Sequence, residues 1–124
     1  MMKKNIESVF IVEDNQLFSM LLEHNLKEKF KLRINSFTSG EDCLKNLNLK
    51  PDLIVLDYFL KGMNGMITLM EIKKINPKIP VVVISSQSNM QTALDFIKLG
   101  AMDYFEKKDN PIKKIMDIVS KYNS

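Results

Sequence analysis

The stretch Pro51-Asp52-Leu53-Ile54-Val55-Leu56-Asp57 decides the fold of this chain. Its central residues, Leu53 to Leu56, are all apolar and lack the alternation of a strand that has one wet face. Such a run is typical of a strand buried on both faces, as in a parallel sheet covered by helices. Asp57 ends the run, and ligands of open α/β folds bind beyond the carboxyl ends of such strands. The stretch therefore predicts a buried strand that delivers a carboxylate to the mouth of a sheet.

Similar apolar runs recur along the whole chain and alternate with helical patterns. The predicted strands are Ser8 to Val12, Leu32 to Phe37, Leu53 to Leu56, Val81 to Ser85 and Asp103 to Phe105. One helical stripe between them consists of Phe18, Leu21, Leu22, Leu26 and Phe30, and another of Ile112, Ile115, Met116, Val119 and Tyr122. Strand–helix alternation repeated about five times indicates βαβ units with right-handed crossovers.

Length and composition indicate one globular domain. The chain has 124 residues, of which 45% are hydrophobic and 27% charged, so we expect a single domain over residues 1–124 without an effector domain. No apolar run approaches the roughly 20 residues that cross a bilayer, and no export signal follows the N-terminus. Cys43 is the only cysteine, which predicts a small buried thiol. We therefore expect a cytoplasmic protein that does not enter membranes.

The charge pattern argues against direct nucleic-acid binding. The net charge is only +3, and its lysines are spread along the chain, as on solvated helix faces. Nucleic-acid binding favours a basic face or a recognisable reading helix, and the sequence has neither. His24, the only histidine, lies off the apolar stripe of its helix and is predicted to face solvent.

Carboxylates follow two of the predicted strands. Glu13 and Asp14 come directly after the first strand, and Asp57 ends the third. Adjacent carboxylates repel each other, so a site that holds them together favours a divalent cation such as Mg²⁺, whose ligands are oxygens. An aspartate can also form an aspartyl-phosphate as a nucleophile. Taken singly, each residue also has a purely structural explanation. Asp14 or Asn15 would then be no more than the cap of the next helix, and Asp57 would make a hydrogen bond at the start of a loop.

Two further strand ends carry a hydroxyl and a cation. Ser85 ends the run Val81 to Ile84, and Lys107 follows Tyr104-Phe105-Glu106. A hydroxyl there could bond a phosphoryl oxygen, and lysine meets phosphate as a point charge. Each residue alone is more often a polar strand end or a solvated lysine. The acid pair, the aspartate, the hydroxyl and the lysine arise in order along the chain, each at a different predicted strand end. This combination is far more specific than any one of its members.

With these motifs combined, the sequence resembles the receiver domain of two-component response regulators, of the chemotaxis-regulator type, from Ile6 to about Tyr122. The segments that carry the resemblance are Phe10 to Asn15, Pro51 to Asp57, Met63 to Gly65, Val83 to Ser86 and Gly100 to Lys107. The resemblance implies an α/β, flavodoxin-like, doubly wound sheet of five parallel strands in order 2-1-3-4-5, with about five helices.

The resemblance also implies a role for each site residue. Asp57 matches the phosphoacceptor, Lys107 the phosphate-contacting lysine, Ser85 the switch hydroxyl and Tyr104 the aromatic switch. For Mg²⁺ (or Mn²⁺), the implied ligands are Asp14 and Asp57 directly, Glu13 mainly through water, and the backbone carbonyl of Phe59. The implied function is a non-enzymatic, stand-alone response regulator that accepts a phosphoryl group and assists its own dephosphorylation.

The implied partners are a sensor histidine kinase or a histidine phosphotransfer protein, and a downstream protein target. The implied output face consists of the helix from Ala93 to Leu99, the strand at Tyr104 and the helix from Ile112 to Tyr122. We expect a monomer or a weak dimer that depends on phosphorylation.

The chain departs from the family pattern in the loops. Proline is common in the family where Lys61 stands, and a Lys-Pro pair is common where this chain has Lys107-Lys108. Without proline a cis bond there is disfavoured by about 2.5–4 kcal/mol, so the loop and the output surface could differ in shape. The bulky Phe59 lies two residues beyond Asp57, and we expect it to hinder attacking water and lengthen the phosphorylated lifetime.

Three other functions compete with this interpretation. The first is a haloacid-dehalogenase-type phosphatase, which needs a second aspartate where Phe59 stands. The second is a flavodoxin-like cofactor binder, in which Glu13 and Asp14 would repel the phosphate of the cofactor. The third is a phosphorylation-independent docking module built on the receiver fold, and phosphorylation of Asp57 would separate it from the main interpretation.

Overall fold

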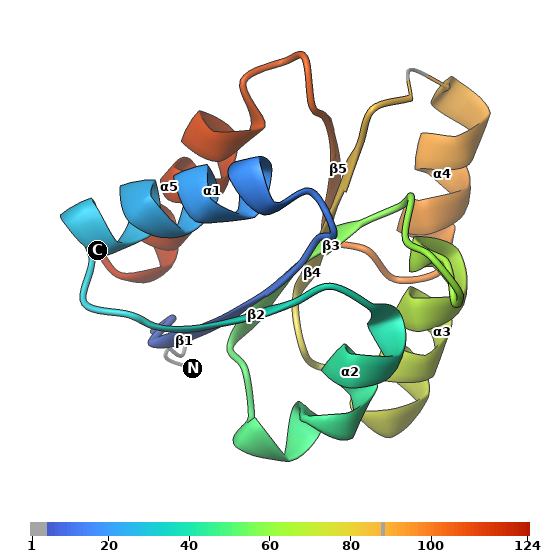
Figure 1. Cartoon of the computed structure of the whole chain (residues 1–124), viewed down its shortest axis with the longest axis horizontal. Helices are drawn as coiled ribbons and strands as arrows, with labels where there is room; N and C mark the ends of the chain where they lie inside the picture. The colour runs from blue at the N-terminus through green and yellow to red at the C-terminus, as the bar shows by residue number, and fades with distance from the viewer. Residues whose placement is uncertain (1–4, 88) are drawn as a thin grey trace.

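The computed structural model describes residues 5–87 and 89–124, so residues 1–4 and 88 of the predicted domain lie outside the described part. Strands and helices alternate along the chain (Figure 1). They are β1 (Ser8–Val12), α1 (Gln16–Lys29), β2 (Arg33–Phe37), α2 (Gly40–Lys45), the 3-10 turn η1 (Leu47–Leu49), β3 (Leu53–Asp57), α3 (Gly65–Ile75), β4 (Val81–Ser85), α4 (Met90–Lys98), β5 (Asp103–Glu106) and α5 (Pro111–Tyr122). Every predicted strand is present, and its ends lie within one residue of the prediction.

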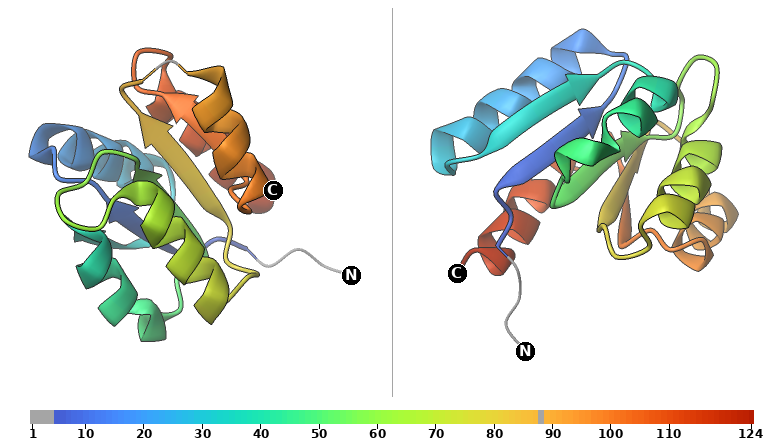
Figure 2. Two further views of the ribbon diagram at one scale, coloured as in Figure 1. Left: turned by 90° about the vertical axis from the view of Figure 1, so that its right-hand side faces the viewer. Right: turned by 90° about the horizontal axis from the view of Figure 1, so that it is seen from below.

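The five strands form one parallel sheet in the order β2-β1-β3-β4-β5. The predicted flavodoxin-like, doubly wound α/β fold is therefore confirmed. The register aligns the strand ends, because Val12 pairs with Leu56 and Asp57 pairs with Ile84. Figure 2 shows the strands running side by side with helices on both sides. The polar residues that follow the strands consequently meet at the carboxyl-terminal ends of the strands.

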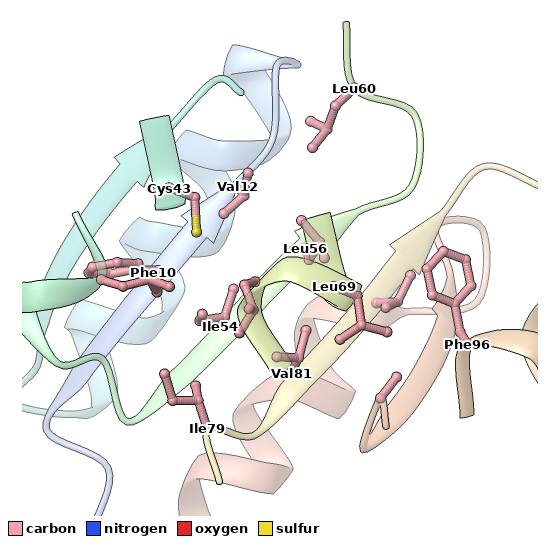
Figure 3. Close-up of a cluster of buried hydrophobic side chains, with 14 residues drawn as sticks. Phe10, Val12, Cys43, Ile54, Leu56, Leu60, Leu69, Ile79, Val81 and Phe96 are labelled. Carbon is pink, nitrogen blue, oxygen red and sulfur yellow. The ribbon is translucent and has the colours of Figure 1, made fainter. Parts of the chain in front are cut away.

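Each face of the sheet has its own hydrophobic core. Helices α1 and α5 cover one face, and α2, α3 and α4 cover the other (Figure 1). Alternate residues of each central strand point to opposite faces, so Val9 and Ile11 pack under α1 and α5, whereas Phe10 and Val12 pack under α2. Figure 3 shows the second of these cores, with Phe10, Val12, Cys43, Ile54, Leu56, Leu60, Leu69, Ile79, Val81 and Phe96 labelled. Burial on both faces explains why these strands lack sequence alternation.

The prediction that Leu21 belongs to the buried stripe of α1 is wrong. Its side chain is 47% exposed, whereas Ser19, Leu22 and Leu26 are buried. Those three residues are spaced three and four apart and share one helix face, while Leu21 is rotated by about 100° from Leu22. Near the start of α1, the small side chain of Ser19 therefore takes the place on the sheet-facing side that the apolar pattern assigned to a larger residue.

Predictions for two isolated residues are confirmed. Cys43 is fully buried in the core under α2, and this burial raises the pKa of its thiol to about 12. The His24 side chain is 69% exposed and lies 3.6 Å from Glu28. In the described part of the chain, no helix is long and apolar enough to cross a membrane.

Asparagine side chains fix the helices that begin at the carboxyl edge of the sheet. The side chains of Asn15, Asn64 and Asn89 accept the backbone N–H groups of Phe18, Ile67 and Thr92, respectively, in the first turns of α1, α3 and α4. Such caps satisfy otherwise unpaired donors. The short loops next to Glu13 and Asp57 are thereby anchored.

The loop after β5 has no cis peptide bond, because every peptide bond in the described residues is trans, including Lys107–Lys108. Asn110 there adopts a left-handed conformation with φ of 50°. Asp109 and Lys114 close the loop with an ion pair of 2.7 Å.

Candidate functional site

The sheet register places Glu13 beside Asp57. Val12 pairs with Leu56, so the next residue of each chain segment, Glu13 and Asp57, lies at the adjoining strand ends. Both residues are only 2% exposed. Two carboxylates are thus held in contact with the protein interior, where an ionised group without compensation is costly.

Asp14 completes an acidic cluster with these two residues. One carboxylate oxygen each from Glu13, Asp14 and Asp57 lies within 4.8 Å of the others. Glu13 also accepts the backbone N–H of Asn15 at 3.0 Å. Asn15 caps α1, so the capping role considered from the sequence belongs to Asn15, while Asp14 joins the cluster.

Lys107 reaches into the acidic cluster from the end of β5. Its Nζ lies 2.5 Å from Glu13 Oε1 and 3.6 Å from Asp57 Oδ2, and its side chain is only 23% exposed. The backbone N–H of Lys107 donates to the Ser85 carbonyl at 2.7 Å, which fixes the base of the side chain. Lys107 is therefore a member of the site and not a solvated surface lysine.

The carboxyl group of Asp57 has a raised pKa. Burial, followed by its interaction with Glu13, raises the pKa of Asp57 from 3.8 to about 7. Lys107 and the backbone N–H of Phe59 oppose this shift only in part. Glu13 Oε1 has its ionic contact with Lys107, whereas Asp57 Oδ1 is buried without a hydrogen-bond partner among the described residues. An unpartnered carboxylate oxygen within an acidic cluster suits a divalent cation, whose charge would offset the repulsion.

Ser85 and Tyr104 are connected through the backbone of Gln87. The hydroxyl of Ser85, which is fully buried, accepts the Gln87 N–H at 3.0 Å. The hydroxyl of Tyr104 donates to the Gln87 carbonyl at 3.2 Å. The Tyr104 ring packs against Phe96 of α4, with 5.7 Å between ring centroids. A movement of the Ser85 hydroxyl would therefore disturb the peptide that holds Tyr104.

The β3–α3 loop is anchored by backbone hydrogen bonds at Met63 and Gly65. At its start Phe59 is 47% exposed, and its ring lies 4.7 Å from that of Tyr58. Further along, the Glu41 side chain of α2 accepts the Met63 N–H at 3.2 Å. Where the loop enters α3, a Cβ on Gly65 would lie 2.5 Å from the Asp57 carbonyl oxygen, so only glycine allows this approach.

A model of the response regulator receiver domain family matches residues 9–120. The chain belongs to this family. An NtrX-like response regulator from Rickettsia conorii is 37% identical over 112 residues, which are 87% of this chain and 23% of that protein. The transcriptional regulatory protein CssR of Bacillus subtilis is 31% identical over 120 residues, which are 92% of this chain and 53% of that protein.

Solved receiver domains have the same structure. The receiver domain of NtrX from Brucella abortus has a TM-score of 0.82 and 28% identity, and the match covers 92% of this chain and 96% of that one. The signal receiver domain of a LuxO-type repressor from Vibrio parahaemolyticus has a TM-score of 0.85 and 25% identity, with coverages of 94% and 89%. The family assignment supports signalling by phosphorylation in a two-component system. The chain spans about a quarter to a half of the length of the curated relatives above.

At the carboxyl-terminal ends of the strands, the structure brings together four residues predicted from the sequence: Glu13, Asp14, Asp57 and Lys107. Ser85 and Tyr104 lie on the neighbouring strands β4 and β5. Sequence reasoning missed the Gln87 link, because a backbone hydrogen bond leaves no residue signature. The helical pattern predicts Phe18 only as a member of an apolar stripe, whereas its ring centroid lies 5.0 Å from Lys107 Nζ.

A large hollow of the described surface lies away from these residues. It has a volume of about 590 Å³ and is lined by residues that include Leu47, Pro51 and Ile79, which precede β3 and β4. Those residues lie at the amino-terminal edge of the sheet, opposite the acidic cluster. The site is therefore identified by its charges and not by its volume.

Proposed function

We propose that Asp57 accepts a phosphoryl group from the phosphohistidine of a sensor histidine kinase or a histidine phosphotransfer protein. The observation that carries this proposal is the Asp57 carboxylate, which is buried, has one unpartnered oxygen and lies 3.6 Å from the Lys107 ammonium. A carboxylate so placed is a nucleophile with a positive charge beside it.

The transfer exchanges one bond to phosphorus for another. An Asp57 oxygen forms the new P–O bond while the P–N bond to histidine breaks, and its electron pair returns to the imidazole. Three nearby carboxylates would repel the incoming phosphoryl group, and Lys107 offsets part of that charge. The protein contributes position and charge, as is usual for phosphoryl transfer.

The acidic cluster fits Mg²⁺ or Mn²⁺, because it offers several oxygens around an unpartnered one. Asp14 and Asp57 would hold the ion directly, Glu13 through water, and the Phe59 carbonyl would complete the protein ligands. When bound, the ion supplies positive charge that neutralises the carboxylates and the transferring phosphoryl oxygens.

Ser85 and Tyr104 would report the phosphorylated state. Phosphoryl oxygens on Asp57 offer the Ser85 hydroxyl a new partner, and Ser85 would exchange its bond with the Gln87 N–H for it. The Gln87 peptide would then loosen its hold on the Tyr104 hydroxyl, and the ring would move toward the space that Ser85 leaves. Phosphorylation would thus bias one of two arrangements of Ser85 and Tyr104.

The output surface would be the face formed by α4, β5 and α5. On α4, Met90, Leu94 and Ile97 are exposed at a spacing of four and three residues, which forms an apolar stripe on one helix side. Tyr104 lies beside α4 through its contact with Phe96. A change at Tyr104 therefore reaches the surface that a downstream protein would bind.

Intact mass after incubation with acetyl phosphate tests the proposal. Wild-type protein should gain one phosphoryl group with Mg²⁺ and none with excess chelator. Asp57→Ala should gain none in either condition. No gain in the wild type, or a gain that persists in Asp57→Ala, would instead favour a docking module that works without phosphorylation of Asp57.

A further inference from the structure

We propose that Phe18 is a positioning residue that holds the Lys107 ammonium at the phosphoryl pocket through a cation–π contact. The inference rests on the proposed function, because it assigns Lys107 to the phosphoryl group. Phe18 lies in the first turn of α1, and its ring centroid is 5.0 Å from Lys107 Nζ. A cation within about 6 Å of a ring face is attracted by the ring quadrupole.

The surroundings of Lys107 make this contact useful. Its Nζ lies closer to Glu13, at 2.5 Å, than to Asp57, at 3.6 Å. To meet a phosphoryl group on Asp57, the ammonium has to shift from Glu13 toward Asp57. A hydrogen-bonding partner would resist that shift, whereas a ring face attracts the ammonium without fixing a direction. The ring therefore restricts the lysine to the pocket in both positions.

The placement of Phe18 is built into the fold. Its backbone N–H donates to the Asn15 cap at 3.0 Å, so the first turn of α1 is fixed next to Glu13. Its side chain packs partly against the core under α1 and α5, which orients the ring. A leucine at this position keeps the apolar packing and the backbone bond but removes the π face.

Phe30 provides a matched control. It also packs partly against the same core, and Lys29 Nζ lies 5.6 Å from its ring. It caps the opposite end of α1, away from the acidic cluster. Phe30→Leu therefore removes a similar aromatic ring and cation–π contact without touching Lys107.

Binding of beryllofluoride, an analogue of a phosphoryl group on a carboxylate, tests the inference with Mg²⁺ present. Phe18→Leu should weaken beryllofluoride binding about threefold to tenfold, Phe18→Trp should restore it, and Phe30→Leu should match the wild type. Mg²⁺ affinity measured alone should stay unchanged in Phe18→Leu, because the ring acts through Lys107. If Phe18→Leu does not fold, Phe18→Met gives the same comparison.

Ring-current shifts provide a second readout that needs no ligand. The Lys107 Nζ and Cε resonances should be shielded in the wild type and lose that shielding in Phe18→Leu. Equal beryllofluoride affinity in wild type and Phe18→Leu, or a parallel loss of Mg²⁺ affinity, would overturn the inference. If wild-type protein does not bind beryllofluoride, the proposed function fails. The Lys107 resonances still test the cation–π contact in that case, because identical Lys107 resonances in the wild type and Phe18→Leu would overturn it.

Discussion

At the scale of the residue, Asp57 combines burial with like charge. Its carboxylate lies beside Glu13 in the interior, and its pKa is raised to about 7. Ionisation of Asp57 near neutral pH therefore costs folding free energy. On the proposed function, a bound cation or phosphoryl transfer to Asp57 would relieve that cost, so the charge repulsion that destabilises the free domain would favour ligand binding.

Replacing Asp57 by Asn should stabilise the metal-free domain above neutral pH. The folded pKa of about 7 exceeds the ordinary value of 3.8, so the folded wild type binds more protons than the unfolded chain between these values. Wild-type stability should then fall as pH rises from about 4 to about 7, with little further change from this group. Asp57→Asn lacks that slope, and urea unfolding at pH 8 should show a gain on the order of 2–4 kcal/mol.

The same unfolding experiment at pH 4 is the control for this prediction. There the wild-type carboxyl is largely protonated in the folded state, so the two proteins should differ little. A stability difference that is the same at pH 4 and pH 8 would show that charge at Asp57 is not the cause.

Phe59 should lengthen the phosphorylated lifetime. The side chain is half exposed and stands two residues beyond Asp57, where a bulky ring hinders water from reaching the phosphoryl group. We expect Phe59→Asn to dephosphorylate several times faster in a single-turnover decay, and Phe59→Leu to stay close to the wild type. An unchanged decay rate in Phe59→Asn would remove this role.

At the scale of the element, the β3–α3 connection fixes the position of Asp57. The Gly65 N–H donates to the Tyr58 carbonyl at 2.9 Å, and α3 begins there in contact with the strand end. A Cβ on Gly65 would lie 2.5 Å from the Asp57 oxygen and 2.7 Å from the Tyr58 Cα. Both neighbours are backbone atoms, so they cannot move aside as a flexible side chain would.

Gly65→Ala should therefore destabilise the domain and disturb the proposed metal site together. We expect a loss of about 1–3 kcal/mol in denaturant unfolding and a weaker Mg²⁺ affinity, because the Asp57 backbone has to shift. Ile67→Ala in the same helical turn is the control, since Ile67 is 46% exposed. A Gly65→Ala variant with wild-type stability would mean that the connection tolerates a side chain.

The strands could be predicted from the sequence to within a residue at each end, whereas the helix predicted from Ala93 to Leu99 spans Met90–Lys98. Runs such as Val81 to Ile84 carry the information, because strands buried on both faces must be apolar throughout. It was harder to predict which residues of α1 face the sheet and which face solvent. Leu21 is exposed where the apolar stripe placed it in the core, since one residue of helical rotation decides between sheet and solvent.

The members of the site could be named from strand-end motifs and the family resemblance, but their contacts could not. The sequence indicates that Glu13 and Lys107 lie near Asp57. It does not indicate that Lys107 sits closer to Glu13 than to Asp57. Nor does it indicate the Gln87 backbone link between Ser85 and Tyr104, because both depend on side-chain rotamers and loop paths.

At the scale of the whole molecule, the amino-terminal and carboxyl-terminal ends of the strands differ in the contacts they make. At the amino-terminal edge, the Asn123 side chain exchanges two hydrogen bonds with the backbone of Ile6, at 2.7 and 2.9 Å. These bonds tie the end of α5 to the segment before β1. The carboxyl-terminal ends of the strands instead gather the acidic cluster and Lys107, and we propose that this end of the sheet responds to phosphorylation.

Mg²⁺ should stabilise the entire domain if, as we propose, it binds the folded cluster and not the unfolded chain. At a free concentration 100 times the dissociation constant, linkage gives about 2.7 kcal/mol, measurable as a higher denaturant midpoint. Asp14→Asn should lose most of this gain by removing one carboxylate of the cluster, whereas Asp117→Asn on the exposed side of α5 should keep it. Equal gains in both variants would contradict an ion at the cluster.

The central claim is that Asp57 carries the phosphoryl group, and locating the modified residue tests it most directly. Borohydride reduces an aspartyl-phosphate to homoserine, which tandem mass spectrometry assigns to a position. After treatment with acetyl phosphate and Mg²⁺, we predict homoserine at position 57 and at no other aspartate. Homoserine at another position, or none in a protein that has gained a phosphoryl group, would contradict the claim.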